Sequence, residues 1–134
     1  AVIDTNVLVS ALITHNSLSA MAKVVRLLLE GGFVPLYESN IIEEYQEVLH
    51  RSKFKLLPDV ADAIISYIKE HGIETSRTAF QELMPDEDDR VFYEVSLSVD
   101  DSFLVTGNLK HYPQMPKVIS PADFINVIME SQEE

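Results

Sequence analysis

Acidic residues that could bind a divalent cation stand at separated positions of the chain, each beside an apolar pattern. Asp4 follows three apolar residues and precedes the apolar run from Val7 to Leu12. A carboxylate in such surroundings is poorly solvated, and its burial is costly unless a cation, a metal or several hydrogen-bond donors accompany it. The alternative interpretation is that Asp4 only caps a helix that begins near Asn6, with its carboxylate accepting backbone N–H bonds.

Two further acids share a helix face with apolar residues. Glu44 lies three positions after Ile41 and four before Val48, so it falls on the apolar stripe of its helix. Asp89 lies three positions before Phe92 and shares part of that helix's apolar face. A polar residue at the edge of a stripe is common, so neither position alone establishes a site. The hypothesis is that Asp4 and these two acids converge.

Converging carboxylates suit the hydrolysis of a phosphodiester. A divalent ion activates a water and offsets the charge on phosphorus, and hard oxygen ligands favour Mg²⁺. The sequence has no cysteine, and its four histidines are scattered, which makes a zinc site unexpected. Each histidine is expected at the surface or at a helix end: His15, His50, His71 and His111. A glycine-rich phosphate loop and a Ser–His–Asp arrangement are also missing from the sequence.

Short apolar strands and amphipathic helices alternate along the chain and must position these acids. Strands are expected over 2–3, 33–37, 73–75, 103–105 and 117–119. Helices are expected over 7–13, from Ser17 or Ser19 to Gly31, from Ser39 or Asn40 to 50, over 58–70, from 86 to about 99, and from 121 to 129, with a frayed tail from Glu130. Pro35 places its strand at an edge or in an irregular position, because proline cannot donate to the ladder.

This alternation predicts a single α/β domain over residues 1–134, with a mainly parallel sheet covered on both faces. In such folds ligands gather beyond the carboxyl ends of the strands, at a switch point in strand order. Asp4 and the sequence Thr106-Gly107-Asn108 both follow an apolar strand. These residues are therefore expected to lie at the same end of the sheet as the ligand.

Composition limits the class of partner. The net charge of −12 argues against passive nucleic-acid binding, but less against a metal nuclease, whose working face is cationic once metal is bound. The absence of cysteine fits a cytoplasmic protein. The sequence contains no apolar run of membrane-spanning length and no signal-peptide pattern at its start. The basic stretch 51–55 is either a solvated helix end or a contact for phosphate or a partner.

Four segments, in this order, resemble the PIN domain: Val2–Leu8, Ile41–Leu49, Asp88–Glu94 and Leu104–Asn108. The nearest branch is that of the toxins of toxin–antitoxin systems related to VapC. The resemblance spans nearly the whole chain. It implies a three-layer α/β/α sandwich with a small central sheet, and an endoribonuclease that depends on Mg²⁺ or Mn²⁺.

Carried over by position, the resemblance gives catalytic and metal-binding roles to Asp4, Glu44 and Asp89. It makes Asn6 the residue that orients the first acid and Thr106 the hydroxyl near the fourth position. Asn108 stands where many members have a fourth acid. This departure removes a negative charge and puts a second metal in doubt, unless another acid, Glu94 or Asp101, compensates.

The resemblance also implies partners. RNA is the expected substrate, with phosphate or partner contacts expected from Arg51, Lys53, Lys55, Lys110 and His111. A cognate antitoxin is expected to fill the cleft with an arginine that reaches the acids. Independently of the resemblance, an apolar helix face such as that of 58–70 predicts self-association, as a dimer or a higher form. The alternative is a PIN-like binding module with weak or lost catalysis, which Asn108 and the acidic surface support.

Overall fold

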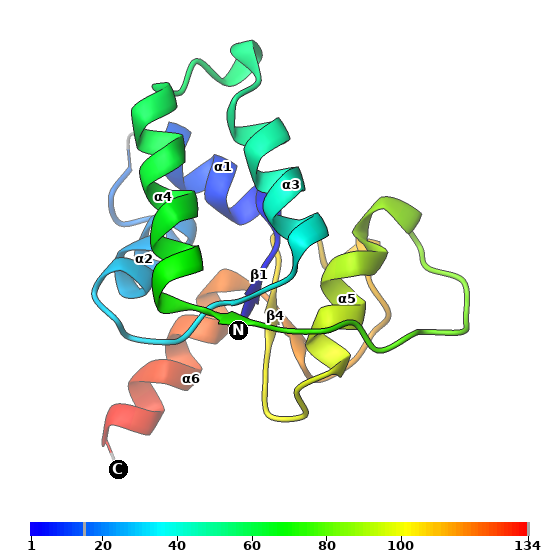
Figure 1. Ribbon diagram of the computed structural model, residues 1–134. Helices are drawn as coiled ribbons and strands as arrows, with labels where there is room; N and C mark the ends of the chain where they lie inside the picture. Colours follow the sequence, from blue (N-terminus) through cyan, green and yellow to red (C-terminus); the bar gives the residue numbers. More distant parts are fainter. Residues whose placement is uncertain (15, 134) are drawn as a thin grey trace.

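Five short parallel strands form the centre of the protein (Figure 1). The computed structural model describes residues 1–14 and 16–133. One sheet has the order β1-β4-β5, with strands Val2–Ile3, Leu104–Val105 and Val118–Ile119. A second sheet pairs β2 (Leu36–Tyr37) with β3 (Ile73–Glu74).

Backbone hydrogen bonds join the two sheets through Ala1. The Ala1 nitrogen donates to Val34 O at 2.7 Å, and Leu36 N donates to Ala1 O at 2.8 Å. Bonds from one residue to both neighbours of Pro35 are typical of a parallel pair. The strands therefore follow one another as β3-β2-β1-β4-β5, and the order reverses between β1 and β4. Ligands of open α/β sheets bind at such a reversal, beyond the carboxyl ends of the strands.

Helices cover both faces of these strands. Their bounds are α1 Thr5–Ile13, α2 Ala20–Leu29, α3 Ser39–Leu49, α4 Pro58–His71, α5 Arg90–Leu97 and α6 Pro121–Glu133. α3 packs against α4 and α5, and α5 also contacts β1, β2 and β4. α2 packs between α1 and α6, on the side drawn fainter in Figure 1. This arrangement confirms the expected α/β sandwich with a small parallel sheet.

The predicted apolar stripes form the core. Val2, Leu104 and Phe92 are fully buried, as is the strand residue Val105. On α4, the residues predicted to face inward are all buried: Ala61, Ile64, Ile65 and Ile68. Among the helices that the structure describes in residues 1–14 and 16–133, none combines the length and apolarity needed to cross a bilayer.

Several predicted boundaries differ from the structure. α1 begins at Thr5 rather than residue 7, and α6 continues through Glu133, so the tail predicted to fray from Glu130 is helical up to that residue. Ser19, not Ser17, caps α2, because its side chain accepts a bond from Ala22 N. α3 begins at Ser39, one of the two predicted starts, and Glu38 is its N-cap. Glu134 and His15 lie outside the described residues.

The strand predicted over 33–37 is shorter than expected, and of the two positions that Pro35 allowed it does not take the edge. β2 lies between β1 and β3, although it contains only Leu36 and Tyr37. Pro35 stands just before the strand, where its missing N–H costs no ladder bond and its carbonyl accepts from Ile73 N at 3.0 Å. The irregular position that proline also allowed is therefore the one observed.

Within the residues that the structure describes, three short 3₁₀ helices connect the regular elements: η1 Ser52–Phe54, η2 Glu87–Asp89 and η3 Leu109–His111. η2 leads directly into α5, within the stretch expected to be helical. η1 follows α3, and η3 follows β4, so both lie at the end of the sheet where the chain leaves β1.

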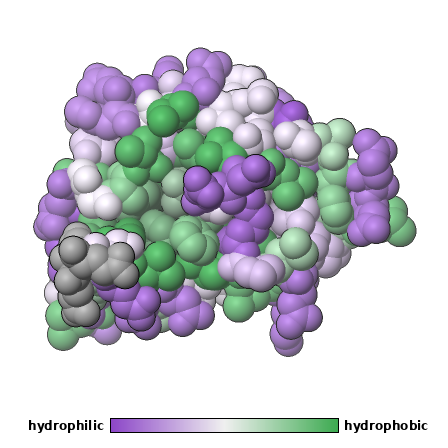
Figure 2. Space-filling view, turned by 90° about the horizontal axis from the view of Figure 1, so that it is seen from below, coloured by the Kyte–Doolittle hydropathy of each residue, from purple (hydrophilic) through white to green (hydrophobic). Residues whose placement is uncertain are grey.

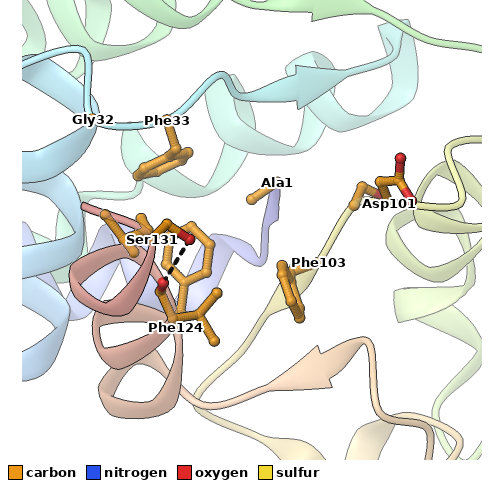
Figure 3. Close-up of a pocket in the computed structure, with 10 residues that line it drawn as sticks. Ala1, Gly32, Phe33, Asp101, Phe103, Phe124 and Ser131 are labelled. Carbon is orange, nitrogen blue, oxygen red and sulfur yellow. Dashed lines mark hydrogen bonds between the residues drawn. The ribbon is translucent and has the colours of Figure 1, made fainter. Parts of the chain in front are cut away.

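The opposite end of the sheet carries an apolar hollow. Figure 2 shows this face of the molecule, with hydrophobic residues gathered around its middle. The hollow has a volume of about 310 Å³ and includes Ala1, Phe33, Phe103 and Phe124 in its lining. Figure 3 shows the rings gathered around it, and the Phe33 and Phe124 rings meet edge to face with centroids 4.9 Å apart.

Candidate metal-binding cleft

Asp4 is held at the carboxyl end of β1 by hydroxyl groups from another part of the chain. Only 4% of its surface is exposed. Thr106 Oγ1 donates to Asp4 Oδ2 at 2.8 Å, and the Tyr112 hydroxyl donates to the same oxygen at 3.0 Å. Asp4 also occupies the N-cap position of α1, but Oδ2 is directed to these two side chains rather than to a helical N–H. Helix capping alone therefore does not account for its surroundings.

The turn after β4 is tied to the start of α1. Asn108 N donates to Thr106 Oγ1 at 2.9 Å, and Gly107 N donates to Asn6 Oδ1 at 3.3 Å. Asn6 thus bonds to the β4 turn and so fixes the position of α1 next to it. Together these bonds place the residues that follow β1 and β4 side by side.

Glu44 reaches the same place from α3. The neighbouring Tyr45 is buried, and its hydroxyl donates to Ile3 O at 2.5 Å, which fixes α3 against β1. Glu44 itself is half-buried, and its Oε2 accepts a hydrogen bond from Thr5 Oγ1. The adjacent Glu43 is exposed, in keeping with the predicted apolar stripe.

Asp89 approaches from the junction of η2 and α5. Its Oδ2 lies 3.0 Å from His111 Nδ1, and Asp86 Oδ2 lies 3.6 Å from the same nitrogen. The Asp89 side chain is 14% exposed and that of His111 is 44% exposed. η3 therefore brings a histidine to the two acids that η2 presents.

These side chains line one cleft with a volume of about 440 Å³. The polar lining consists of Asp4, Thr5, Asn6, Ser10, Glu44, Arg51, Asp86, Asp88, Asp89, Asn108 and His111. The cleft lies at the carboxyl ends of the strands, next to the reversal of strand order between β1 and β4. The acids that are far apart in the sequence therefore face a common space.

Burial and mutual repulsion make these acids harder to ionise. Burial raises the pKa of Asp4, against the lowering effect of the bonds from Thr106 and Tyr112. Burial also raises the pKa of Glu44, and the charge of Asp4 adds to the increase. The pKa of Asp89 is raised to about 6, first by burial and then by the charge of Asp4. A bound cation would relieve this shared electrostatic cost.

The carboxylates and the imidazole of the cleft suit a divalent cation, but they are not all equally close to one another. In the described part of the chain, one group of three has all its ligand atoms within 4.8 Å of one another: Asp86, Asp89 and His111. Asp4 and Glu44 line the same cleft and are not members of that group. Carboxylates that share a cleft repel one another, which favours wider spacing. Mg²⁺ also retains several waters, so every acid need not contact it directly.

A comparison with protein families places this arrangement in a known class. The model of the PIN domain matches residues 1–110. The chain belongs to the PIN domain family. PIN domains are generally nucleases that use divalent metals, which agrees with a cleft rich in carboxylates. No curated protein and no solved structure matches this PIN domain.

The basic residues expected to contact RNA are distributed unevenly around the cleft of this PIN domain. Arg51 lines the cleft and forms a two-pronged ion pair with Glu47, at 3.0 Å from Nε and 2.7 Å from Nη2. Lys53 and Lys55 are exposed on and just after η1, and neither lines the cleft. Lys110 is exposed on η3 and lines a neighbouring cavity.

Glu94 and Asp101 are not placed to replace the missing fourth acid. Glu94 Oε1 accepts from Arg77 Nε at 3.0 Å and from Nη2 at 2.8 Å, and its Oε2 accepts from Phe80 N at 2.9 Å. This buried carboxylate ties the extended segment before η2 to α5. Asp101 lines the apolar hollow at the opposite end of the sheet.

Several residues that line the cleft, or that support its acids from behind, could not be identified from the sequence. Tyr112 lacks a periodic pattern, because it lies in an irregular segment after η3. Asp86 and Asp88 stand at the start of η2 and α5, where the helix dipole already favours one or two acids, so sequence position does not distinguish a role in the cleft. Phe54 lines the cleft. It lies within the basic stretch 51–55, whose interpretation from the sequence rests on its charges alone.

Proposed function

We propose that this PIN domain is a metal-dependent endoribonuclease, with Asp4, Glu44 and Asp89 as the acids that hold Mg²⁺ or Mn²⁺. The observation that supports this proposal is that these three carboxylates share one cleft at the switch point of the sheet. The raised pKa of each is what close, partly buried acids show before a cation joins them.

The protein's own residues orient the acids before substrate arrives. Thr106 and Tyr112 both donate to Asp4 Oδ2, so the Asp4 carboxylate is held in one orientation. Thr5 does the same for Glu44 through its Oγ1. When bound, a divalent ion would supply positive charge opposite the phosphate and favour ionisation of the attacking water. Preorganised acids avoid the cost of reordering side chains during the reaction.

Substrate contact is proposed for the basic residues around the cleft. Arg51 lines the cleft together with the acids and would bind a phosphate that flanks the reacting one. Lys53, Lys55 and Lys110 are exposed near the rim and would add less specific attraction to the RNA backbone.

The biological role proposed from the resemblance is that of the toxin in a cytoplasmic toxin–antitoxin pair. A protein of net charge −12 suits a basic partner. An arginine of an antitoxin would bind carboxylates of the cleft and block the cation. Dimer formation through α4 is part of the same proposal, and Val60 on that helix is 41% exposed.

The test compares cleavage of a labelled single-stranded RNA by the parent and by Asp4→Asn, with Mg²⁺, with Mn²⁺ and with EDTA. We expect cleavage with either metal, none with EDTA, and none by the variant. Asp59→Asn, at an exposed position of α4, is the matched control and should cleave as the parent does. If Asp4→Asn remains folded and cleaves as fast as the parent, Asp4 is not catalytic.

A binding module with lost catalysis is the second candidate. Two observations favour it: Asn108 lines the cleft as a neutral amide, and Asp4 and Glu44 stand apart from the tightest group of ligand atoms. Titration calorimetry with Mn²⁺ separates the two candidates. A nuclease must bind the ion, whereas a module that binds RNA without any affinity for Mn²⁺ and without cleavage would support the second.

A further inference from the structure

The neutral fourth position of the cleft, Asn108, is the N-cap of the short helix η3, and a histidine ends that helix. Asn108 is exposed and its backbone N–H is used by Thr106 Oγ1. Three residues later, η3 turns His111 into the cleft. His111 lies one position beyond the residues that match the family model.

The His111 ring nitrogen that faces the cleft is surrounded by carboxylate oxygens. Nδ1 lies 3.0 Å from Asp89 Oδ2 and 3.6 Å from Asp86 Oδ2. These three groups are the set whose ligand atoms all lie within 4.8 Å of one another in the part of the chain that the structure describes. They come from two separate elements, η2 with its cap residue and η3, so their meeting is a product of the tertiary fold rather than of local sequence.

We propose that His111, Asp86 and Asp89 form a second cation position, which replaces the missing fourth acid and prefers Mn²⁺ to Mg²⁺. The inference rests on the proposed function, because Asp89 would be shared between this position and the one next to Asp4 and Glu44. Two cations about 4 Å apart that share a carboxylate form a common arrangement for phosphodiester hydrolysis.

The chemistry of the donors gives the preference for Mn²⁺. Imidazole nitrogen binds first-row transition metals well, whereas Mg²⁺ is held mainly by carboxylates, phosphates and waters. Mn²⁺ accepts both kinds of ligand. An all-carboxylate position discriminates less between the two ions, so replacing an acid by a histidine shifts the balance toward Mn²⁺.

His111 has a second role that the same contacts would permit. A protonated His111 would act as an internal counter-ion for Asp86 and Asp89, and would then hold no metal. The two roles differ in one observable. A ligand transmits electron spin from Mn²⁺ to its nitrogen nucleus, whereas a counter-ion displaced by the metal does not.

The experiment is pulsed electron paramagnetic resonance of Mn²⁺ added to the full chain at pH 7.5, with modulation from directly bound nitrogen as the signal. We expect ¹⁴N modulation in the parent and in His71→Gln, and its loss in His111→Gln. His71 is the matched control because it lies on α4 and stacks on Tyr67, with ring centroids 4.3 Å apart. His111 is partly exposed, so its replacement should leave the circular dichroism spectrum and the thermal midpoint nearly unchanged.

Calorimetry gives the second readout. His111→Gln should weaken the second Mn²⁺ binding step by at least about tenfold and change Mg²⁺ binding by less than about threefold. Asp86→Asn should weaken the same Mn²⁺ step. Unchanged Mn²⁺ affinity in both variants would overturn the proposal.

The outcomes separate this inference from the proposed nuclease. Mn²⁺ binding and RNA cleavage without ¹⁴N modulation in the parent would refute the histidine site and leave the nuclease intact. Modulation that disappears in His111→Gln, in a protein that does not cleave RNA, would support the site and count against the nuclease. If the parent binds no Mn²⁺ at all, the histidine site is refuted, and the nuclease is refuted as well if Mg²⁺ supports no cleavage.

Discussion

Thr106 and Asp4 are 102 positions apart in the chain, and the Thr106 hydroxyl donates to Asp4 Oδ2 at 2.8 Å in the interior of the protein. Both residues follow parallel strands that pair directly, β4 and β1. The bond therefore links the acid of the cleft to the central sheet. Thr106 Oγ1 also accepts a hydrogen bond from Asn108 N. One hydroxyl group therefore contacts the residues that follow both β1 and β4, on the two sides of the switch point.

Replacement of Thr106 by valine should separate the orientation of Asp4 from the packing of its neighbours. Valine has nearly the same shape, but it removes the donor to Asp4 and the acceptor for Asn108 N. We expect a loss of about 1 to 2 kcal/mol in the free energy of unfolding, measured by urea denaturation. Because the Thr106 bond lowers the pKa of Asp4, its loss should raise that pKa further and weaken Mn²⁺ binding.

Thr78→Val is the matched control for this substitution. Thr78 is exposed, in the extended segment that precedes η2. We expect its free energy of unfolding and its Mn²⁺ affinity to stay close to those of the parent. Equal effects of the two substitutions would show that the Thr106 hydroxyl does not orient Asp4.

The positions of Asp4 and Glu44 could be predicted because local patterns determine them. An acid at the end of an apolar strand in a parallel sheet must lie at the carboxyl edge, where Thr106 also lies. The helical period places Glu44 on the stripe that faces β1. In both cases the backbone direction of a regular element fixes where the side chain goes.

The positions of Tyr112, His111 and Glu94 could not be predicted in the same way. Tyr112 and His111 follow β4 through a turn and one 3₁₀ helix, and no periodicity fixes the direction of their side chains. Glu94 lies on an apolar helix face like Glu44, but Arg77 reaches it from a segment without regular structure. The sequence pattern alone does not distinguish a buried acid paired with arginine from one that faces a cleft.

Glu94→Gln should destabilise the protein without removing metal binding. The substitution leaves Arg77 and Arg90 beside a neutral amide, and breaking a buried ion pair is costly. We expect a loss of about 2 to 3 kcal/mol, somewhat below the cost of deleting a buried partner, because glutamine keeps part of the hydrogen bonding. Glu74→Gln, on the exposed strand β3, is the control and should change stability little. A Glu94→Gln protein as stable as the parent would show that this ion pair does not hold the segment before η2.

The raised pKa of Asp89 predicts how stability changes with pH in the absence of metal. Burial and the charge of Asp4 raise this pKa from 3.8 to about 6 in the folded protein. Between these values the folded state binds more protons than the unfolded state, so this group lowers the free energy of unfolding as pH rises from about 4 to about 6. This reduction in the free energy of unfolding persists above pH 6.

Asp89→Asn should therefore be more stable than the parent at pH 7, by about 1 to 2 kcal/mol once solvent screening is allowed for. The difference should be small near pH 4, where Asp89 is protonated in the folded parent and still partly protonated in the unfolded state. Urea denaturation at the two pH values, with EDTA present, measures it. The quantity to compare is the free energy of unfolding of Asp89→Asn minus that of the parent. If this difference is lower at pH 7 than at pH 4, the raised pKa is contradicted. Asp59→Asn should show no such dependence, because Asp59 is exposed on α4.

The same proton competes with the cation for Asp89. Below pH 6 the apparent affinity for Mn²⁺ should fall by up to about tenfold per pH unit, because Asp89 must lose its proton before it can act as a ligand. Calorimetry between pH 5 and pH 7.5 measures this slope, and proton release can be followed in buffers of different ionisation enthalpy. An affinity that does not change over this range would exclude Asp89 as a ligand.

Arg51 should contribute to RNA affinity and little to metal binding. Its guanidinium lines the cleft, but its present partner is the exposed Glu47, and exposed ion pairs contribute little to stability. Arg51→Gln should weaken RNA binding and reduce the slope of log affinity against log salt concentration by about 1, as expected for the loss of one phosphate contact. Fluorescence anisotropy with a catalytically inactive Asp4→Asn background measures both quantities. Lys69→Gln is the matched control, because Lys69 is exposed on α4, away from the cleft. An equal change of slope in the two variants would mean that attraction to RNA comes from the overall charge, and that Arg51 has no defined phosphate partner.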